Sequence, residues 1–477
     1  MSPRQSRTLV VVLGVVIGAL TGYRYELGFI AAAALGAVVL ALYRPYALAI
    51  GLFGWAAVRA PVIQALPQLF WAINAAEAGV LALVLLAALL RGSNGHWLFA
   101  RRWPWVAAGL FTLAATVSAV INGSSLLQVA MGLRGHFLVP LTALAAAILV
   151  DGTNARKFAV RMAIVVALAQ VPIGLAQFVL SGTASKGPDI VFGTLGAGGS
   201  NNLGFLMLGA MAAFAGEYVR TRRVPYMLGV LVCAPVFVFA SSRLGLLMSP
   251  AVMLTAVVFA RPERGRGLGL SRRTLVAVVA LASAFALVAV YYEYRPLTVQ
   301  RDLSPQYFLT DQGVFIERGV SRMGYLYYGS QFVDRYARVP ALGTGPASAS
   351  SGAAANIGGA LAYEFSYGLQ LFGNSNTLDP TRPGFVPLPP ELASNLVEYG
   401  WIGTSLFMAF AVGIGLTIWQ RLQTARFPGL TRPSFALWFG LYTVGTLYTS
   451  AWEGFSIIAV GFWWWTIVLT SGRRRVE

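Results

Sequence analysis

Cysteine and charge are both scarce in this chain. The 477 residues include a single cysteine, Cys233, which excludes intrachain disulfides and metal sites built from several cysteines. Charged residues make up 11% of the chain, whereas an average soluble domain has about 25%. Hydrophobic residues make up 57%. This balance excludes an ordinary soluble enzyme and indicates a membrane protein.

Long apolar runs take the place of charge. Each extends over roughly 16–25 residues, the length of an α-helix that crosses a bilayer. We therefore predict an all-α polytopic membrane protein with about 14 transmembrane helices, in the range 12–14. Arg4 and Arg7 precede the first run as in a signal peptide, but no cleavage site follows, so we expect an uncleaved span. The predicted spans are 8–22, 27–43, 45–60, 72–90, 104–121, 127–150, 157–180, 200–218, 224–241, 243–260, 274–292, 394–419, 434–450 and 455–470.

The net charge of +18 comes mostly from arginines in alternate connections between these runs. Basic connections such as 91–102, 220–223 and 261–273 alternate with short ones that hold single charges. This alternation is the positive-inside pattern, and it places both termini in the cytoplasm of a multi-pass protein of the cytoplasmic (inner) membrane. The basic loops also meet anionic headgroups, so membrane lipids are expected partners and nucleic acid is not.

Residues 293–392 form one long polar insert between two apolar runs. Because long connections in compact proteins are usually functional, we interpret the insert as a catalytic or binding cap. The charge pattern places it on the extracytoplasmic face. The chain then divides into 1–292 with helices 1–11, the extracytoplasmic (periplasmic) cap loop 293–392, and 393–477 with helices 12–14 and a basic cytoplasmic tail.

The insert has local patterns of its own. Residues 315–338 can form a helix despite their glycines, and Arg318, Arg322 and Tyr325 would then share one face at three- and four-residue spacing. The stretch 343–360, rich in Gly, Ala and Ser, is expected to be a loop that brings backbone N–H groups to a ligand. Residues 373–390 are predicted to be irregular.

Polar residues outside the insert face the same side in this topology. Arg243 lies in Ser-Ser-Arg-Leu-Gly at 241–245, Asn202 ends a glycine-rich stretch that opens a span, and Arg134 and His136 lie in the outer half of the sixth span. An arginine at membrane depth is costly and by default marks a functional site or a buried pair. The alternative for Arg134 and Arg243 is snorkelling toward lipid phosphate.

Four of these arginines suit one ligand. A guanidinium offers a planar fork of donors that matches phosphate oxygens and stays ionised. A lipid-linked diphosphate presents such oxygens at headgroup depth, whereas a soluble anion would need no arginine within the membrane. The sequence therefore predicts a diphosphate-binding site at the outer leaflet, formed by Arg134, Arg243, Arg318 and Arg322.

Several motifs occur in one order over residues 125–420. They are the stretches 193–202 and 241–245, Arg322 eighteen residues before Pro-Ala-Leu-Gly-Thr-Gly at 340–345, and Glu391 before Glu-Tyr-Gly-Trp-Ile-Gly at 398–403. The set resembles the O-antigen ligase and O-antigen polymerase superfamily of bacterial surface-polysaccharide assembly. The resemblance implies a metal-independent inverting glycosyltransferase without a cofactor. Such enzymes transfer a glycan from undecaprenyl diphosphate to an acceptor hydroxyl outside the cytoplasmic membrane.

One departure from the family pattern concerns the catalytic base. The ligases have a histidine about nine residues before the glutamate of the Glu-x-Gly-x-x-Gly element, and here that position is Pro389. Glu391 is the nearest ionisable group. A carboxylate can serve as the base if burial or neighbouring groups raise its pKa toward the working pH. This acidic variant is more similar to the polymerase branch, which we favour over the ligase.

The predicted roles follow from this chemistry. Arg243 and Arg322 bind the diphosphate and stabilise its charge as it leaves, supported by Arg318 and Arg134. Glu391 is the candidate base, and Glu398 shares that role or orients Arg243. Structural alternatives remain for both glutamates, since Glu398 in the first turn of a helix meets the helix dipole favourably. The remaining candidates are His136 as an alternative base or ligand of the substrate, Asn202 in the glycine-rich stretch, and Tyr325 stacking on a sugar or lying in an aromatic belt.

Three other functions stay open. An O-antigen ligase would transfer a finished glycan to lipid A core or protein, whereas a polymerase would lengthen the lipid-linked glycan, with a chain-length regulator as a possible partner. A lipid-glycan transporter or flippase would also be polytopic and basic. Transporters usually show internal repeats and ionisable residues near the bilayer midplane, and neither is evident here. A purely structural scaffold would leave the arginines unexplained.

Overall fold

In the described part of the chain, the protein is helical apart from connecting turns and one hairpin whose two strands have two residues each. The computed structural model describes residues 25–90, 101–149, 153–180, 191–196, 199–240, 243–258, 260, 315–316, 319–320, 322–373 and 391–424. Its helices are α2 (Tyr25–Tyr43), α3 (Pro45–Ala65), α4 (Phe70–Leu90), α5 (Trp103–Asn122), α6 (Leu126–Leu149), α7 (Thr153–Leu180), α8 (Ser200–Thr221), α9 (Val224–Phe239), α10 (Arg243–Val258), α14 (Arg322–Tyr336), α15 (Gly352–Ile357), α16 (Ala360–Gly373) and α17 (Glu391–Thr424). Short 3-10 turns η1 (Pro67–Leu69) and η3 (Pro340–Leu342) and the strands β1 (Phe315–Ile316) and β2 (Gly319–Val320) complete the set.

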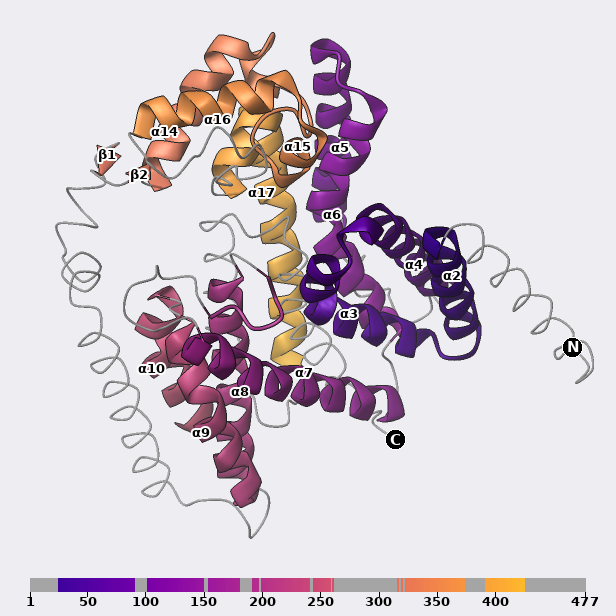
Figure 1. Ribbon diagram of the computed structural model, residues 1–477, viewed down its shortest axis with the longest axis vertical. Helices are drawn as coiled ribbons and strands as arrows, with labels where there is room; N and C mark the ends of the chain where they lie inside the picture. The colour runs from indigo at the N-terminus through magenta and orange to yellow at the C-terminus, as the bar shows by residue number, and fades with distance from the viewer. Residues whose placement is uncertain are drawn as a thin grey trace, which may run out of the picture.

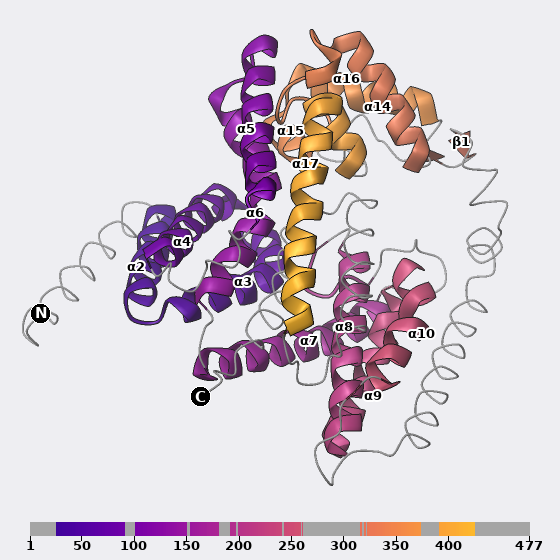
Figure 2. The same cartoon turned by 180° about the vertical axis from the view of Figure 1, so that it is seen from behind.

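The long helix α17 connects the two ends of the molecule. It runs down from α14, α15 and α16, which we call the cap helices, between a group formed by α2–α4 and a group formed by α8–α10 (Figures 1 and 2). Its first turns contact α14 and η3, and it packs along α5. The cap helices therefore rest on the ends of helices that form the body of the protein.

Five of the described helices are long and apolar enough to cross a membrane by length and composition: Pro45–Ala65, Trp103–Asn122, Arg161–Leu180, Ser200–Thr221 and Glu391–Ile414. The chain is thus consistent with a multi-pass membrane protein. Ten of the fourteen predicted spans coincide with helices α2 to α10 and α17. The ranges 8–22, 274–292, 434–450 and 455–470 lie outside the described residues, so the number of spans remains a prediction.

Small residues dominate the contacts between the helices. Buried alanines recur on α3, α5 and α7, for example Ala56, Ala108 and Ala167, each no more than 6% exposed. Helices approach closely where their side chains are small, and this is how helices associate when lipid tails remove the hydrophobic driving force. The core thus follows from the alanine content of the apolar runs.

The cap differs from the prediction at two places. Phe315–Ile316 pairs with Gly319–Val320 as an antiparallel hairpin, and α14 begins only at Arg322. The prediction of one helix over 315–338 is therefore wrong at its start, because Ile and Val favour strands and Gly319 weakens a helix. The stretch 343–360 is also more than a loop, since 352–357 form α15.

The cap helices have a small core of their own. Phe332 and Val333 of α14 pack on Phe365 of α16 and Val397 of α17. The Tyr328 hydroxyl donates a hydrogen bond to the Phe365 carbonyl at 3.2 Å. Burial raises the pKa of the Tyr328 phenol above its ordinary value, and the neighbouring Tyr336 and Glu364 add to this. This core holds the cap helices on the start of α17.

Candidate functional site

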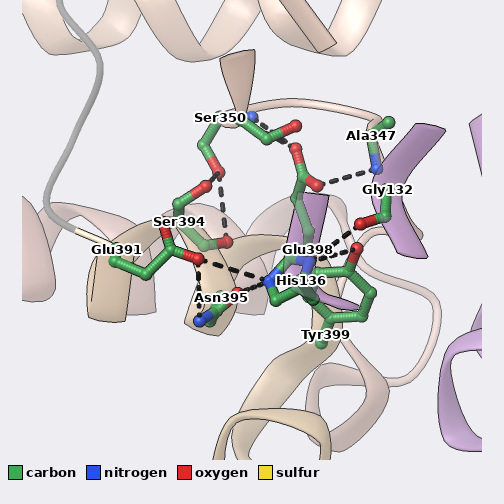
Figure 3. Close-up of polar contacts among 10 residues, drawn as sticks. Gly132, His136, Ala347, Ser350, Glu391, Ser394, Asn395, Glu398 and Tyr399 are labelled. Atoms are coloured by element: carbon green, nitrogen blue, oxygen red, sulfur yellow. Dashed lines mark hydrogen bonds and ion pairs between the residues drawn. The ribbon is translucent and has the colours of Figure 1, made fainter. Parts of the chain in front are cut away.

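The first two turns of α17 carry four polar residues on one face. They lie at positions i, i+3, i+4 and i+7, a spacing that aligns side chains along one side of a helix. All four are buried, and their side chains are directed toward α6 or the turn at 347–351 (Figure 3). They are Glu391, Ser394, Asn395 and Glu398.

A break in α17 lets the backbone of the cap dock beside this face. Gly400 has φ 63° and ψ −170°, which interrupts the helix. The interruption leaves the carbonyl groups of Val397 and Glu398 to accept hydrogen bonds from the Thr344 and Gly345 N–H groups, at 2.9 and 3.0 Å. The Gly-Thr-Gly turn at 343–345 and the Glu-Tyr-Gly element at 398–400 are therefore two halves of one joint.

The Glu398 carboxylate lies in a nest of backbone N–H groups. It is completely buried, and its two oxygens accept hydrogen bonds from the turn that follows Gly345. The N–H···O distances are 2.7 Å for Ala347, 3.3 Å for Ala349, 3.0 Å for Ser350 and 2.8 Å for Ser351. The predicted loop thus brings its N–H groups to a glutamate of the protein itself.

This geometry bears on the predicted role of Glu398. The structural alternative for Glu398 assumed that this residue lies in the first turn of a helix. Helix α17 begins earlier, at Glu391, so this assumption is wrong. Four backbone donors compensate the buried charge instead, as a buried carboxylate requires. Glu398 is therefore well suited to fix the turn 347–351 to α17.

His136 of α6 meets the start of α17 in a buried group that we call the His136–Glu391 centre: His136, Asn395 and Glu391 (Figure 3). The His136 Nε2 contacts the Asn395 Oδ1 and lies 3.4 Å from the Glu391 Oε1. The Asn395 amide donates to the same Glu391 oxygen at 3.4 Å. His136 and Glu391 are 1% and 2% exposed. The centre couples an imidazole to a carboxylate, the pairing used to take up and pass on a proton.

The other side of the imidazole is fixed by α6 and by aromatic rings. The His136 Nδ1 donates to the Gly132 carbonyl at 2.8 Å, since a carbonyl can only accept. Phe111, Tyr399 and Phe407 surround the ring, with centroid distances of 5.3, 4.8 and 4.9 Å. The ring therefore has one orientation, with Nε2 directed at Asn395 and Glu391.

Helix α5 ties the joint to the body of the protein. The Ser118 hydroxyl donates to the Leu342 carbonyl at 2.7 Å, and the Asn122 amide donates to the Gly343 carbonyl at 3.0 Å. In the cap, the Arg338 guanidinium donates to the Ile121 carbonyl at 2.8 Å. These bonds hold the turn at 340–345 against the end of a candidate span.

The structure separates Arg134 from His136. The Arg134 guanidinium lies 3.5 Å from Glu77 of α4, and Arg59 of α3 donates to the same carboxylate at 2.6 Å. Of the outcomes expected for a membrane arginine, Arg134 shows an ion pair, with a buried carboxylate and a partly exposed guanidinium. The predicted convergence of Arg134 with Arg243, Arg318 and Arg322 stays a prediction, because the side chains of those three arginines lie outside the described residues.

The remaining predicted residues are placed by their elements. Arg243 is the first residue of α10, and Arg322 is the first residue of α14. The side chains of both arginines lie outside the described part of the chain, as does the whole of Arg318. Asn202 is buried in the first turn of α8, which begins at Ser200 as predicted. Tyr325 packs against the cap core.

Sequence reasoning missed Asn395, Tyr399 and the contacts that Trp55 and Arg59 make with Glu77. Asn395 lies four residues after Glu391, so helical spacing could have indicated their contact. Trp55, Arg59 and Glu77 could have been found as polar residues within predicted spans. Within the described residues, no three His, Cys, Asp or Glu side chains gather as metal ligands would.

Comparison with known proteins adds no family assignment. No protein-family model and no curated protein sequence matches the chain. The resemblance of the motifs therefore remains a hypothesis.

Proposed function

We propose that the protein is an inverting glycosyltransferase that uses a polyprenyl-diphosphate-linked glycan at the outer face of the cytoplasmic membrane. The observation that carries the proposal is the His136–Glu391 centre, a buried imidazole–carboxylate pair. It lies where a helix long enough to cross a membrane meets the cap helices. In the predicted topology, this is the level at which a lipid-linked sugar would meet a water-soluble acceptor.

The reaction needs one base and one stabilised leaving group. The acceptor oxygen attacks the anomeric carbon as the bond from that carbon to the diphosphate oxygen breaks, so a single displacement inverts the configuration. The leaving diphosphate keeps the electron pair, and the acceptor proton passes to Glu391. His136 and Asn395 hold the Glu391 carboxylate and so act as positioning residues. General-base catalysis of this kind contributes about 10²- to 10⁴-fold.

Arg243 and Arg322 are proposed to bind the diphosphate. Each lies at the start of a helix, α10 and α14, where a cation is disfavoured by the helix dipole. An anion at the same place interacts favourably with both the arginine and the free N–H groups of the helix. Their positions therefore support a site that is completed by a phosphate.

Access to the base requires movement. Glu391 is 2% exposed, so an acceptor hydroxyl reaches its carboxylate only after a local opening at the start of α17. The break at Gly400 makes the short segment 391–399 a separate helical unit, and we propose that this unit moves relative to the rest of α17. We infer that donor binding drives this opening.

A lengthening reaction is favoured over a single transfer because, in the family that the motifs resemble, an acidic residue at this position is more similar to the polymerase branch. The test is to incubate the purified protein with a lipid-linked oligosaccharide in the absence of an ion gradient. A ladder of longer glycans on the lipid is the expected result for a polymerase. One transfer to lipid A or a protein would identify a ligase, and an intact donor that only changes leaflet would identify a flippase and refute the proposal.

A further inference from the structure

A second charged cluster lies on the far side of α6 from the His136–Glu391 centre. Residues 134 and 136 are two positions apart, about 200° around a helix, so their side chains leave α6 in nearly opposite directions. His136 faces α5 and α17, whereas Arg134 faces Glu77 of α4 and Arg59 of α3. The two groups therefore belong to different sites.

The cluster is built around one buried carboxylate. Glu77 is 6% exposed, and its Oε1 accepts hydrogen bonds from the Arg59 Nε at 2.6 Å and the Trp55 Nε1 at 2.8 Å. Its Oε2 has no hydrogen-bond partner among the described residues. Arg134 reaches that oxygen only as an ion pair at 3.5 Å. We call these four residues the Glu77 cluster.

Arg134 has donors to offer to a further anion. Among the described residues, the polar contact of the Arg134 side chain is its ion pair with Glu77. The Arg134 side chain is 27% exposed. A guanidinium has five N–H donors in a planar fork that fits phosphate oxygens. One carboxylate at 3.5 Å leaves most of that capacity for another ligand.

Each charged residue of the Glu77 cluster lies nearer to one end of its helix than to the other. Arg59 is six residues before the end of α3, Glu77 seven residues after the start of α4, and Arg134 eight residues after the start of α6. At 1.5 Å per residue, each is roughly 9–12 Å from its helix end. Because these helices have 21–24 residues, about the length that spans the hydrocarbon layer, this position lies inside that layer, and the long Arg134 side chain meets a lipid phosphate by extending toward the headgroups.

An apolar cavity adjoins the cluster. It has a volume of about 320 Å³ between α2, α3 and α4, and Trp55 and Glu77 form part of its wall. Gly36 and Gly51 also line it, and a Cβ added at either would have no atom within 4 Å. Glycine thus keeps open a space between three apolar helices.

We propose that the Glu77 cluster and this cavity bind one anionic phospholipid, with its phosphodiester on Arg134 and an acyl chain in the cavity. The cavity wall is apolar, as a hydrocarbon chain requires. The carboxylate of Glu77 beside Arg134 disfavours a highly charged diphosphate and leaves a phosphodiester, with its single negative charge, as the better match. This lipid links α2–α4 to α6, and the site is independent of the proposed glycosyl transfer.

The test measures which lipids stay bound to the purified protein, by native mass spectrometry in detergent with added phosphatidylglycerol or diacylglycerol of the same acyl chains, which lacks the phosphodiester. We expect phosphatidylglycerol to be retained at least about tenfold better, since charge-assisted hydrogen bonds contribute about 1.5–3 kcal/mol, more than a factor of ten in affinity. Arg134→Ala should remove this preference, and Arg134→Lys should reduce it because the fork is lost.

A cavity-filling variant tests the other half of the site without changing charge. Gly51→Leu should lower retention of phosphatidylglycerol, because its side chain occupies the space of the acyl chain. Gly79→Leu on α4 is the matched control, since Gly79 also has no atom within 4 Å of an added Cβ but does not line the cavity. Equal retention of both lipids by the wild type, or unchanged retention in Arg134→Ala or Gly51→Leu, would overturn the proposal. Preferential retention of a polyprenyl phosphate over phosphatidylglycerol would do the same.

Discussion

Gly343 and Gly400 approach each other so closely that a Cβ on Gly343 would lie 2.5 Å from the Gly400 backbone nitrogen. Both have positive φ, 73° and 63°. The contact joins the cap to the break in α17, so each glycine is required twice, once for its backbone conformation and once for its missing side chain. It is the joint on which the arrangement of Glu391 and Glu398 depends.

Gly343→Ala should therefore lower the free energy of unfolding by more than the backbone strain of an alanine at this position explains. Gly358→Ala is the control for positive φ, because Gly358 has φ 72° and ψ 51°, a left-handed conformation that other residues can adopt, and no atom within 4 Å of an added Cβ. We expect about 1–2 kcal/mol for the control, and a further 1–3 kcal/mol for Gly343→Ala from overpacking and from its ψ of −168°, which at positive φ only glycine adopts readily. Thermal unfolding of the two variants in the same detergent measures the difference. Equal losses would show that the close contact at Gly400 is absent.

Glu398→Gln should loosen the turn at 347–351. One amide oxygen can still accept hydrogen bonds, but the amide nitrogen now faces an N–H donor and the charge is lost. We expect a loss of about 1–3 kcal/mol, and faster hydrogen exchange at the Ser350 and Ser351 amides. Glu364→Gln, at an exposed residue of α16, is the control and should leave exchange in this turn unchanged. Unchanged exchange in Glu398→Gln would contradict the nest of backbone donors.

His136 and Glu391 should act as a unit. We expect His136→Gln and Glu391→Gln each to slow glycan transfer, and the double variant to be little slower than Glu391→Gln alone. The coupling energy from the four rates should be about 1–3 kcal/mol, as for residues in direct contact. Fully additive effects would separate the imidazole from the catalytic carboxylate.

Arg243→Ala and Arg322→Ala should each reduce product formation to a small fraction of the wild-type rate without affecting membrane insertion. Loss of one preorganised donor to a developing charge lowers the rate by about 10²- to 10³-fold. Arg335→Ala is a suitable control, because Arg335 is an exposed cation in the last turn of α14. Initial rates and the amount of inserted protein are compared for the three variants. A rate near that of the control for either helix-start arginine would remove it from the proposed diphosphate site.

The helices were predictable because their signal is local. Apolar runs of sufficient length gave ranges that coincide with α2–α10 and α17, and the start of α8 at Ser200 followed from the glycine-rich stretch before it. The hairpin at 315–320 was not predicted, because its short pattern also fits a helix. Local patterns thus identify long helices, but over a few residues they do not distinguish a helix from a strand.

The site depends on contacts that local patterns do not contain. His136 and Asn395 are 259 residues apart in sequence. Glu398 was expected to meet a helix dipole or an arginine, whereas the described structure surrounds it with the amides of the loop that was expected to bind a ligand. The sequence shows which side chains are charged or polar. It does not show which of them contact each other in the folded protein, because each polar group has several chemically suitable partners.

The most direct test of the proposed function is a single-turnover rate with a lipid-linked oligosaccharide, measured for Glu391→Gln beside Glu364→Gln. Glutamine keeps the size of Glu391 but cannot accept the proton of the incoming hydroxyl. We predict a fall of about 100-fold or more for Glu391→Gln and an unchanged rate for the exposed control. Transfer by Glu391→Gln at the wild-type rate would contradict its role as the base.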